Sequence, residues 1–274
     1  MTKGLPEFVV VGAAKAATTW IANQLRSRDD VFIPGPEPHY FSSEFDRGEE
    51  WYRSWFVDAR PDQTISEKSA DYLAHEQAPE RMARLLPDAR IVIQLRNPVD
   101  RAYSDYCMYF RRGTVDGDIA RFLGSPDHAF PRFLVDGLYH RHIQRFLDWF
   151  PEDRIKIIFY DDIRSRPLEV VREVTQFLHL PDQGDRLALA ERANVKDAPM
   201  LPLPVRKAFA PVKALVKPLR SKPWFTALHR RLAREVEYPE LGGDLRASMR
   251  DFYAADVENL GALLDRDLTH WLAK

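Results

Sequence analysis

Short unbroken apolar runs recur along the chain, and most are followed by a turn and then by an amphipathic stretch. Runs rich in Val, Ile and Leu at 8–11, 91–95 and 155–160 are typical of strands buried on both faces of a parallel sheet. Shorter strands are expected at 31–33 and near 64–68. The stretches between them predict helices beginning near 18, at 49–56, 76–86, from 98, at 137–150 and at 167–178, with an acidic turn at 161–162.

This alternation predicts an α/β fold with a parallel sheet of about five strands and helices on both faces. The whole chain, 1–274, is expected to form a single domain. No role or regular structure is assigned to residues 113–136, which are rich in loop-forming residues.

The first strand leads into a turn of small residues, 12–17, that leaves the backbone accessible to a ligand. Thr18 and Thr19 follow where a helix should begin, with Trp20 in its first turn. The free N–H groups and the positive dipole of a helix start bind anions, and Lys15 adds a full positive charge. The pattern therefore indicates phosphate binding, although a plain strand-turn-helix corner is also compatible with it.

This turn is not the phosphate loop of nucleotide hydrolases, which needs Gly, four residues, Gly-Lys and then Ser or Thr. Counting from Gly12, the second glycine is replaced by Ala17. The lysine, Lys15, stands three positions earlier than that motif requires.

A second phosphate site is predicted after the strand at 91–95. Asn97 followed by Pro98 is a typical helix start, so Arg96 should lie at the carboxyl end of the strand, where open α/β sheets bind ligands. Ser104 falls two turns into that helix, on the side that faces Arg96. A guanidinium and a hydroxyl suit a phosphate.

The segment 34–41 holds three prolines in five positions, which makes it a stiff, non-helical loop. Glu37 and His39 lie on it and are candidates for acid-base chemistry, although the loop taken alone is explained better by a solvated surface turn. Further along, Glu67 and Lys68 taken alone predict a surface ion pair of little energetic value.

Together these stretches resemble the sulfotransferases that use 3′-phosphoadenosine 5′-phosphosulfate (PAPS). The turn Gly12-x-x-Lys15-x-Ala17-Thr18-Thr19 resembles their 5′-phosphosulfate loop, and the Arg96/Ser104 pair matches their 3′-phosphate motif. The segments 36–41 and 67–72 resemble the heparan-type branch of that family. Two departures stand out, namely Ala17 in place of a glycine and Pro36 in place of a lysine.

The resemblance implies a P-loop-like fold and transfer of a sulfuryl group from PAPS to a hydroxyl or amine, with the adenosine 3′,5′-bisphosphate (PAP) as product and no metal. In the family's pattern Glu37 is the base, Lys15 stabilises the departing phosphate and Lys68 lies near the transferring group. His39 orients the acceptor or serves as the base instead. The residues implied in binding the donor are Lys15, Ala16, Ala17, Thr18, Thr19, Trp20, Arg96 and Ser104.

The composition limits the kinds of partner and the cellular location that are expected for the protein. The formal net charge of −1 gives no reason to expect nucleic-acid binding, and the single cysteine, Cys107, excludes an intramolecular disulfide. The sequence shows neither a long apolar span nor the apolar core of a signal peptide, so a cytoplasmic protein is expected.

A basic variable segment at about 200–240 has no assigned role. Its part 206–234 has nine Lys and Arg residues and no acid. It could cover the donor, bind an anionic or lipid-linked acceptor or a membrane surface, or form a solvated face of packed helices.

The sequence does not identify the acceptor, which could be a small molecule, a sugar or a lipid. Two alternative functions are a P-loop-type small-molecule or nucleoside kinase, which would need magnesium, and a non-catalytic nucleotide-binding module.

Overall fold

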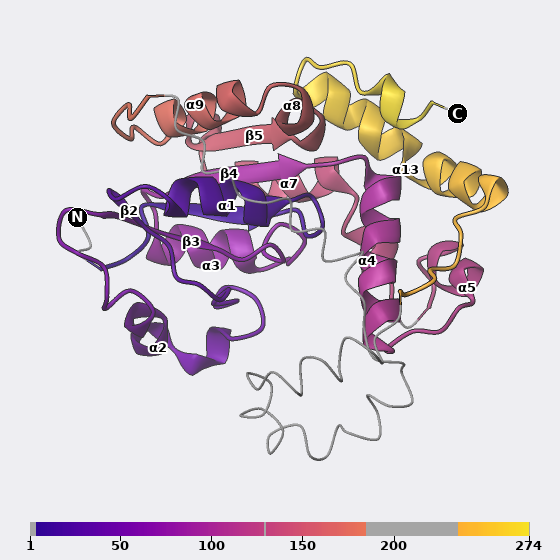
Figure 1. Cartoon of the computed structure of the whole chain (residues 1–274), viewed down its shortest axis with the longest axis horizontal. Helices are drawn as coiled ribbons and strands as arrows, with labels where there is room; N and C mark the ends of the chain where they lie inside the picture. Colours follow the sequence, from indigo (N-terminus) through magenta and orange to yellow (C-terminus); the bar gives the residue numbers. More distant parts are fainter. Residues whose placement is uncertain (1–3, 129, 185–234, 274) are drawn as a thin grey trace.

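A parallel five-stranded sheet forms the centre of the protein (Figure 1). The computed structural model describes residues 4–128, 130–184 and 235–273. The strand order is β2-β3-β1-β4-β5, and each neighbouring pair is parallel. The strands are β1 (Phe8–Gly12), β2 (Val31–Phe32), β3 (Thr64–Lys68), β4 (Arg90–Leu95) and β5 (Ile155–Phe159).

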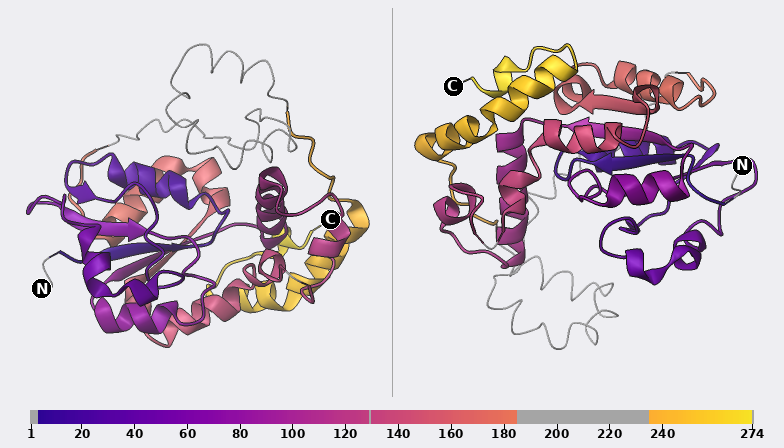
Figure 2. Two further views of the ribbon diagram at one scale, coloured as in Figure 1. Left: turned by 90° about the horizontal axis from the view of Figure 1, so that it is seen from below. Right: turned by 180° about the vertical axis from the view of Figure 1, so that it is seen from behind.

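Both faces of the sheet are covered by helices, because successive side chains of a strand point to opposite sides. Phe8 and Val10 of β1 pack in one apolar cluster with residues of α1 (Thr18–Arg26) and α9 (Pro167–Phe177). Val9 and Val11 pack in the other, with residues of α3 (Ala78–Leu85) and α7 (Tyr139–Leu147). Figure 2 shows these two layers on either side of the strands. The predicted fold class is confirmed.

The remaining helices lie mainly beyond the carboxyl ends of β4 and β5 (Figure 1). The helix α4 begins as predicted, since the Asn97 side-chain oxygen accepts hydrogen bonds from the N–H groups of Val99 and Asp100 at 3.0 and 3.3 Å. The helices beyond β4 and β5 are α4 (Pro98–Arg112), α5 (Ile119–Leu123), α6 (Arg132–Val135), α8 (Tyr160–Ser165) and α13 (Gly243–Leu263). The helix α2 (Glu49–Ser54) lies below the sheet in Figure 1. Short 3₁₀ helices are found at Phe45–Arg47, Glu152–Arg154 and Thr269–Trp271.

Two parts of the structure differ from the sequence-based expectation. The segment 113–136 contains α5 and α6, which are too short to show a helical apolar period. The expected turn at 161–162 is part of α8, where the Asp162 carboxylate receives two hydrogen bonds from Arg266 at 2.8 and 2.9 Å. Arg266 is distant from Asp162 in sequence, so no local sequence pattern predicts this contact. The basic segment 206–234 lies outside the described residues.

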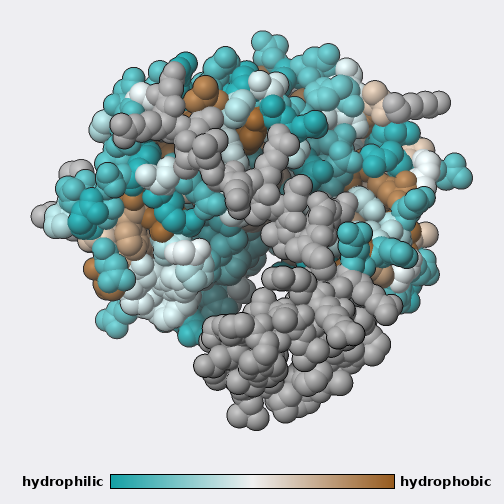
Figure 3. All heavy atoms as spheres, in the orientation of Figure 1, coloured by the Kyte–Doolittle hydropathy of each residue, from teal (hydrophilic) through white to brown (hydrophobic). Residues whose placement is uncertain are grey.

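The outer surface is mostly hydrophilic on the face shown in Figure 3, with a lighter and brown area at the lower left, where α2 lies in Figure 1. Among the helices of the described ranges, none combines the length and the apolar content needed to span a bilayer.

Candidate active site

The turn after β1 passes tightly against the segment that follows β3. Gly12 has a φ of +146°, and a Cβ atom there would lie 2.7 Å from the Leu73 Cβ and 2.8 Å from the Ala70 carbonyl oxygen. Backbone N–H groups of this neighbouring segment donate to β1, from Ser69 to Val10 at 3.1 Å and from Leu73 to Val11 at 2.8 Å. Only glycine fits at this crossing.

The end of β4 holds the other side of the turn. The Ala13 N–H donates to the Gln94 carbonyl oxygen at 2.7 Å, and the Gln94 side-chain amide donates to the Ala16 carbonyl oxygen. The Arg96 guanidinium donates to the Lys15 carbonyl oxygen at 3.3 Å. The sequence analysis missed Gln94, although a fully buried polar residue inside an apolar strand is a detectable signal.

Within this turn two residues other than glycine adopt the left-handed conformation, Lys15 with φ 69° and Ala17 with φ 67°. Ala17 is the residue before α1, and its side chain provides no cap. Thr18 is buried at the helix start, while Thr19 is exposed and Trp20 partly exposed. The Trp20 N–H donates to the Ala17 carbonyl oxygen at 2.8 Å and the Ala16 N–H to the Ala13 carbonyl oxygen at 3.1 Å. The Thr18 and Thr19 N–H groups stand in the first turn of α1, where no carbonyl inside the helix can accept from them, and binding of an anion there stays a prediction.

The Lys15 side chain reaches toward α4, where its Nζ lies 3.7 Å from the Met108 Sδ. Burial lowers the pKa of Lys15, and the nearby charges of Arg112 and Arg96 lower it further, against the opposite effect of Asp105. Arg112 was not among the predicted residues, because the loop and this end of α4 are far apart in sequence. Lys15 thus has Arg96 and Arg112 near it as well as the buried Asp105, and the excess of positive charge favours an anionic ligand.

Arg96 lies at the carboxyl end of β4, as the sequence predicts. Its carbonyl oxygen accepts a hydrogen bond from the Tyr139 hydroxyl at 2.9 Å, and its guanidinium lies 5.1 Å from the centroid of the Tyr160 ring. Ser104 lies in α4 and is partly exposed. Their joint contact with a 3′-phosphate stays a prediction.

Glu37 and Lys68 form an ion pair at the carboxyl end of β3. The other carboxylate oxygen of Glu37 accepts a hydrogen bond from the Ala70 N–H at 2.9 Å. The Lys68 Nζ also lies 3.4 Å from the Thr19 Oγ1, so one ammonium contacts both the Glu37 carboxylate and the turn predicted to bind an anion. Lys68 therefore pairs with Glu37 and not with its sequence neighbour Glu67.

Glu67 points the opposite way from Lys68 and is fully buried. Its carboxyl group receives hydrogen bonds from the hydroxyls of Tyr52 at 2.7 Å, Ser69 at 2.8 Å and Tyr72 at 3.0 Å. Burial raises the pKa of Glu67 to about 7, although the three hydroxyl donors act against this rise. The surface ion pair expected for Glu67 and Lys68 is wrong, because strand alternation sends the two side chains to opposite sides.

Replacing Glu67 with Gln should change how stability depends on pH. The folded-state pKa of about 7 lies above the ordinary value, so the folded protein binds the extra proton. The stability this provides is complete below about pH 4.5 and is lost as the pH rises through about 7, by up to about 3 kcal/mol. Urea unfolding of the wild type and Glu67→Gln at pH 5 and pH 7.5 measures the difference, and parallel pH dependences would contradict it.

His39 faces Asp71, a residue whose role the sequence analysis missed. The His39 Nδ1 lies 2.7 Å from an Asp71 oxygen, and the Ser42 hydroxyl donates to the other oxygen at 2.6 Å. The hydrogen bond to Asp71 raises the pKa of His39, against the effect of its burial. Burial alone would raise the pKa of Asp71, but its bonds with His39 and Ser42 hold it below its usual value. The backbone of His39 has a φ of 52° and its N–H donates to the Ser69 Oγ at 3.0 Å.

Glu37, His39 and Asp71 are also the one group in the described ranges whose ligand atoms could hold a metal ion, since they lie within 4.8 Å of one another. Each carboxylate is already paired, Glu37 with the Lys68 ammonium and Asp71 with His39 and Ser42. An ammonium on a prospective ligand competes with a cation, so the donor set suits an ion-pair network better than a metal.

The turn after β1, Arg96 at the end of β4 and the Glu37–Lys68 pair thus meet at one edge of the sheet. The fold that carries this edge is that of the sulfotransferases. The profile of the family described as "Sulfotransferase domain" matches residues 5–201, and the chain belongs to this PAPS-dependent family.

Particular relatives agree with this assignment. The heparan sulfate glucosamine 3-O-sulfotransferase 6 of Mus musculus is 32% identical over 180 residues, which are 64% of this chain and 52% of the relative. The bifunctional heparan sulfate N-deacetylase/N-sulfotransferase 3 of Mus musculus is 33% identical over 195 residues, 64% of this chain and 22% of the relative. The chain spans about half or less of the length of these curated relatives.

A solved structure matches nearly the whole chain. The crystal structure of a sulfotransferase from Alicyclobacillus acidocaldarius has a TM-score of 0.73 and 25% identity, covering 98% of this chain and 99% of that one. The predicted P-loop-like fold is confirmed by this neighbour.

Proposed function

We propose that the protein transfers the sulfuryl group of PAPS to a hydroxyl or amine of an acceptor. The observation that carries this proposal is the Lys68 ammonium, which is paired with the Glu37 carboxylate and lies 3.4 Å from the Thr19 Oγ1. A candidate base and a candidate anion-binding turn thus share one cation. Membership of the sulfotransferase family supports the same reaction.

Donor binding would use two groups of residues, one in the turn after β1 and one at and after the end of β4. The N–H groups of residues 17–19, the hydroxyls of Thr18 and Thr19 and the Lys15 ammonium would hold the 5′-phosphosulfate. Ala16 and Trp20 would shape the turn, since their N–H groups donate to the Ala13 and Ala17 carbonyl oxygens. Arg96 and Ser104 would hold the 3′-phosphate. Arg96 also donates to the Lys15 carbonyl oxygen at 3.3 Å, so the residue proposed for the 3′-phosphate contacts the backbone of the turn proposed for the 5′-phosphosulfate.

In the transfer step the acceptor oxygen or nitrogen forms a bond to sulfur, and the bond from sulfur to the bridging phosphate oxygen breaks. The acceptor proton passes to the Glu37 carboxylate, and the electron pair leaves on the phosphate of PAP. Lys15 and the backbone N–H groups of the turn would stabilise the negative charge that develops there. Lys68 would lie near the sulfuryl oxygens during the transfer. His39, held by Asp71, would orient the acceptor.

The acceptor is a small molecule or a carbohydrate in this proposal, since the named relatives include heparan sulfate sulfotransferases. A lipid-linked acceptor, contact of segment 206–234 with a membrane, and a cytoplasmic location are parts of the proposal without a structural observation. Nucleic acid is not a proposed partner.

The direct test is binding and turnover without added metal. We expect PAP to bind at micromolar concentration or tighter in EDTA by calorimetry, and labelled PAPS, but not ATP with magnesium, to label an acceptor in a metabolite extract. Loss of PAP binding in EDTA would contradict the metal-free site. Labelling from ATP with magnesium would favour the kinase alternative. Binding of PAP without any turnover would favour the non-catalytic nucleotide-binding module.

Replacing Arg96 with Ala should weaken PAP binding by about 1.5–3 kcal/mol, because a hydrogen bond to a charged group is lost. The preference for PAP over adenosine 5′-monophosphate should fall by the same amount, since only PAP has the 3′-phosphate. Calorimetry with both nucleotides measures this effect. Arg164, exposed on α8, is the matched control, and an unchanged preference in Arg96→Ala would place the 3′-phosphate elsewhere.

Replacing Asp71 with Asn should alter the pH dependence of acceptor binding. The hydrogen bond from His39 keeps the imidazole protonated to a higher pH, and that support is lost with the neutral amide. We expect the acceptor KM to rise by up to about tenfold near pH 7.5 and to recover toward pH 6, while PAP affinity stays constant. Steady-state kinetics across this range measure it, and an equal increase at every pH would indicate a structural role instead.

A further inference from the structure

The 3₁₀ helix Thr269–Trp271 packs against the ends of β4 and β5, from which it is far away in the sequence. It follows α13 and lies outside residues 5–201, which the family profile matches. Figure 1 shows this part of the chain, in yellow, beside α8. Trp271 is 2% exposed, and its ring meets the rings of Tyr139 and Phe159 with centroids 6.2 and 5.9 Å apart. One buried tryptophan therefore anchors this short helix.

Trp271 connects the segment after β4 with the segment after β5. The Asn97 side-chain amide donates to the Trp271 carbonyl oxygen at 3.1 Å, and the Trp271 indole N–H donates to an Asp161 carboxylate oxygen at 3.1 Å. The oxygen of the same Asn97 amide accepts the N–H groups that begin α4, so both ends of that amide are held. A single residue thus joins the start of α4 to the first turn of α8.

The two residues that Trp271 binds directly follow Arg96 and Tyr160 in the sequence. Leu95 pairs with Phe159 in the parallel register of β4 and β5, so Arg96 and Tyr160 leave the sheet side by side. The Arg96 guanidinium lies 5.1 Å from the centroid of the Tyr160 ring. A shift of Trp271 would therefore move the backbone next to Arg96 and next to the ring that its guanidinium faces.

The position of the Arg96 guanidinium depends on the Arg96 backbone. The guanidinium donates to the Lys15 carbonyl oxygen at 3.3 Å, which is long for an N–H···O hydrogen bond. The Arg96 carbonyl oxygen, in contrast, accepts from the buried Tyr139 hydroxyl at 2.9 Å, and the Tyr139 ring meets Trp271 edge to face at an angle of 66°. Trp271 thus supports Arg96 through both Asn97 and Tyr139. A group that must meet a phosphate needs such support, since a misplacement of about 1 Å can weaken a contact strongly.

We propose that Trp271 is a positioning residue for the 3′-phosphate of the donor and that it acts through Arg96. The proposal rests on the proposed function, in which Arg96 holds that phosphate, and adds the part of the chain that gives Arg96 its place. Replacing a tryptophan with a purely structural role would weaken the binding of all nucleotides alike. Replacing a positioning residue weakens PAP more than adenosine 5′-monophosphate, which lacks the 3′-phosphate.

The test measures the preference for PAP over adenosine 5′-monophosphate by calorimetry in two variants that change no charge. Trp271→Phe keeps an aromatic ring but loses the N–H that binds Asp161, and Asn97→Ser keeps an oxygen that can cap α4 but loses the donor to Trp271. Each should lower the preference about 2–10-fold, the range expected for one hydrogen bond, while the affinity for adenosine 5′-monophosphate stays within about twofold. In an Arg96→Ala background, Trp271→Phe should have no further effect on the preference, because both changes act on the same contact.

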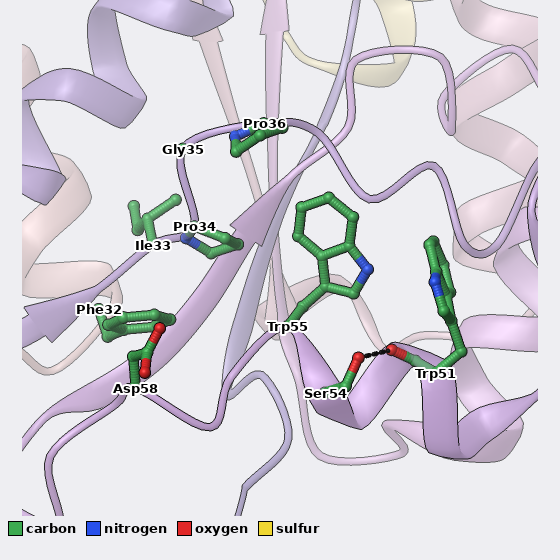
Figure 4. A pocket seen from close by; sticks show the side chains of 9 residues that line it. All are labelled: Phe32, Ile33, Pro34, Gly35, Pro36, Trp51, Ser54, Trp55 and Asp58. Atoms are coloured by element: carbon green, nitrogen blue, oxygen red, sulfur yellow. Dashed lines mark hydrogen bonds between the residues drawn. The ribbon is translucent and has the colours of Figure 1, made fainter.

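Trp55→Phe is the matched control and should leave the preference unchanged. Trp55 lines a cavity beside β2, the edge strand opposite to β5 (Figure 4). If Trp271→Phe does not fold, Asn97→Ser decides alone. An unchanged preference in either folded variant, or an equal loss of affinity for both nucleotides, would overturn the proposal. An unchanged preference in Arg96→Ala would instead refute the proposed 3′-phosphate site itself.

Discussion

Glu37→Gln should reduce kcat by about 10²–10⁴-fold, the usual contribution of a positioned general base. The amide keeps the size of the side chain and an oxygen for the Ala70 N–H, but it cannot take the acceptor proton. PAP affinity should remain close to that of the wild type, because in the described part of the chain the carboxylate is linked to the donor turn through Lys68. Initial rates with labelled PAPS, together with calorimetry of PAP, measure both quantities.

The control for this variant is Glu169→Gln, at an exposed carboxylate of α9. His39→Ala gives the competing assignment a direct trial. We expect it to act mainly on acceptor KM and less on kcat than Glu37→Gln does. Near-normal turnover in Glu37→Gln with an inactive His39→Ala would reverse the two roles and make the histidine the base.

Lys15→Met should reduce kcat by about 10²–10³-fold, the effect of removing one group that stabilises charge in the transition state. The methionine side chain fills similar space without the positive charge. Burial and the charges of Arg112 and Arg96 already lower the pKa of this lysine, so a bound anion is the partner that would favour its protonated form. Single-turnover rates at saturating PAPS separate this effect from weaker donor binding.

Lys156→Met is the matched control, since Lys156 is paired with Glu173 on β5 and α9, away from the turn. A Lys15→Met protein that binds PAP more weakly but retains a normal single-turnover rate would restrict Lys15 to binding.

Local sequence patterns were sufficient to predict those elements whose structure depends on residues close together in the sequence. The apolar runs at 8–11, 91–95 and 155–160 became β1, β4 and β5, because strands with both faces buried contain few polar residues. Asn97 and Pro98 likewise encode the start of α4 in two adjacent positions. The resemblance of four stretches to sulfotransferases was confirmed at the level of the family, whose model matches residues 5–201, while the roles of the single residues stay predictions.

Partners distant in sequence could not be read from such patterns. Lys68 and Glu37 are 31 residues apart and Asp71 and His39 are 32 apart, and their pairing depends on how loop 34–41 lies over the end of β3. The period of two in a strand does separate Glu67 from Lys68, but only if the strand is known to reach Lys68. The contribution of Gln94 requires the turn and β4 to be neighbours in the sheet.

The left-handed backbone of Lys15 and Ala17 determines whether the predicted phosphate-binding turn could be transferred to another protein on its own. This conformation costs roughly 1–2 kcal/mol for each residue other than glycine, so an isolated peptide of residues 12–19 would not maintain it. The turn is held by Gln94, in β4, and by Arg96, the residue directly after that strand. Grafting the motif into a different protein would therefore require the end of β4 as well, and the functional unit is a corner of the sheet and not a stretch of sequence.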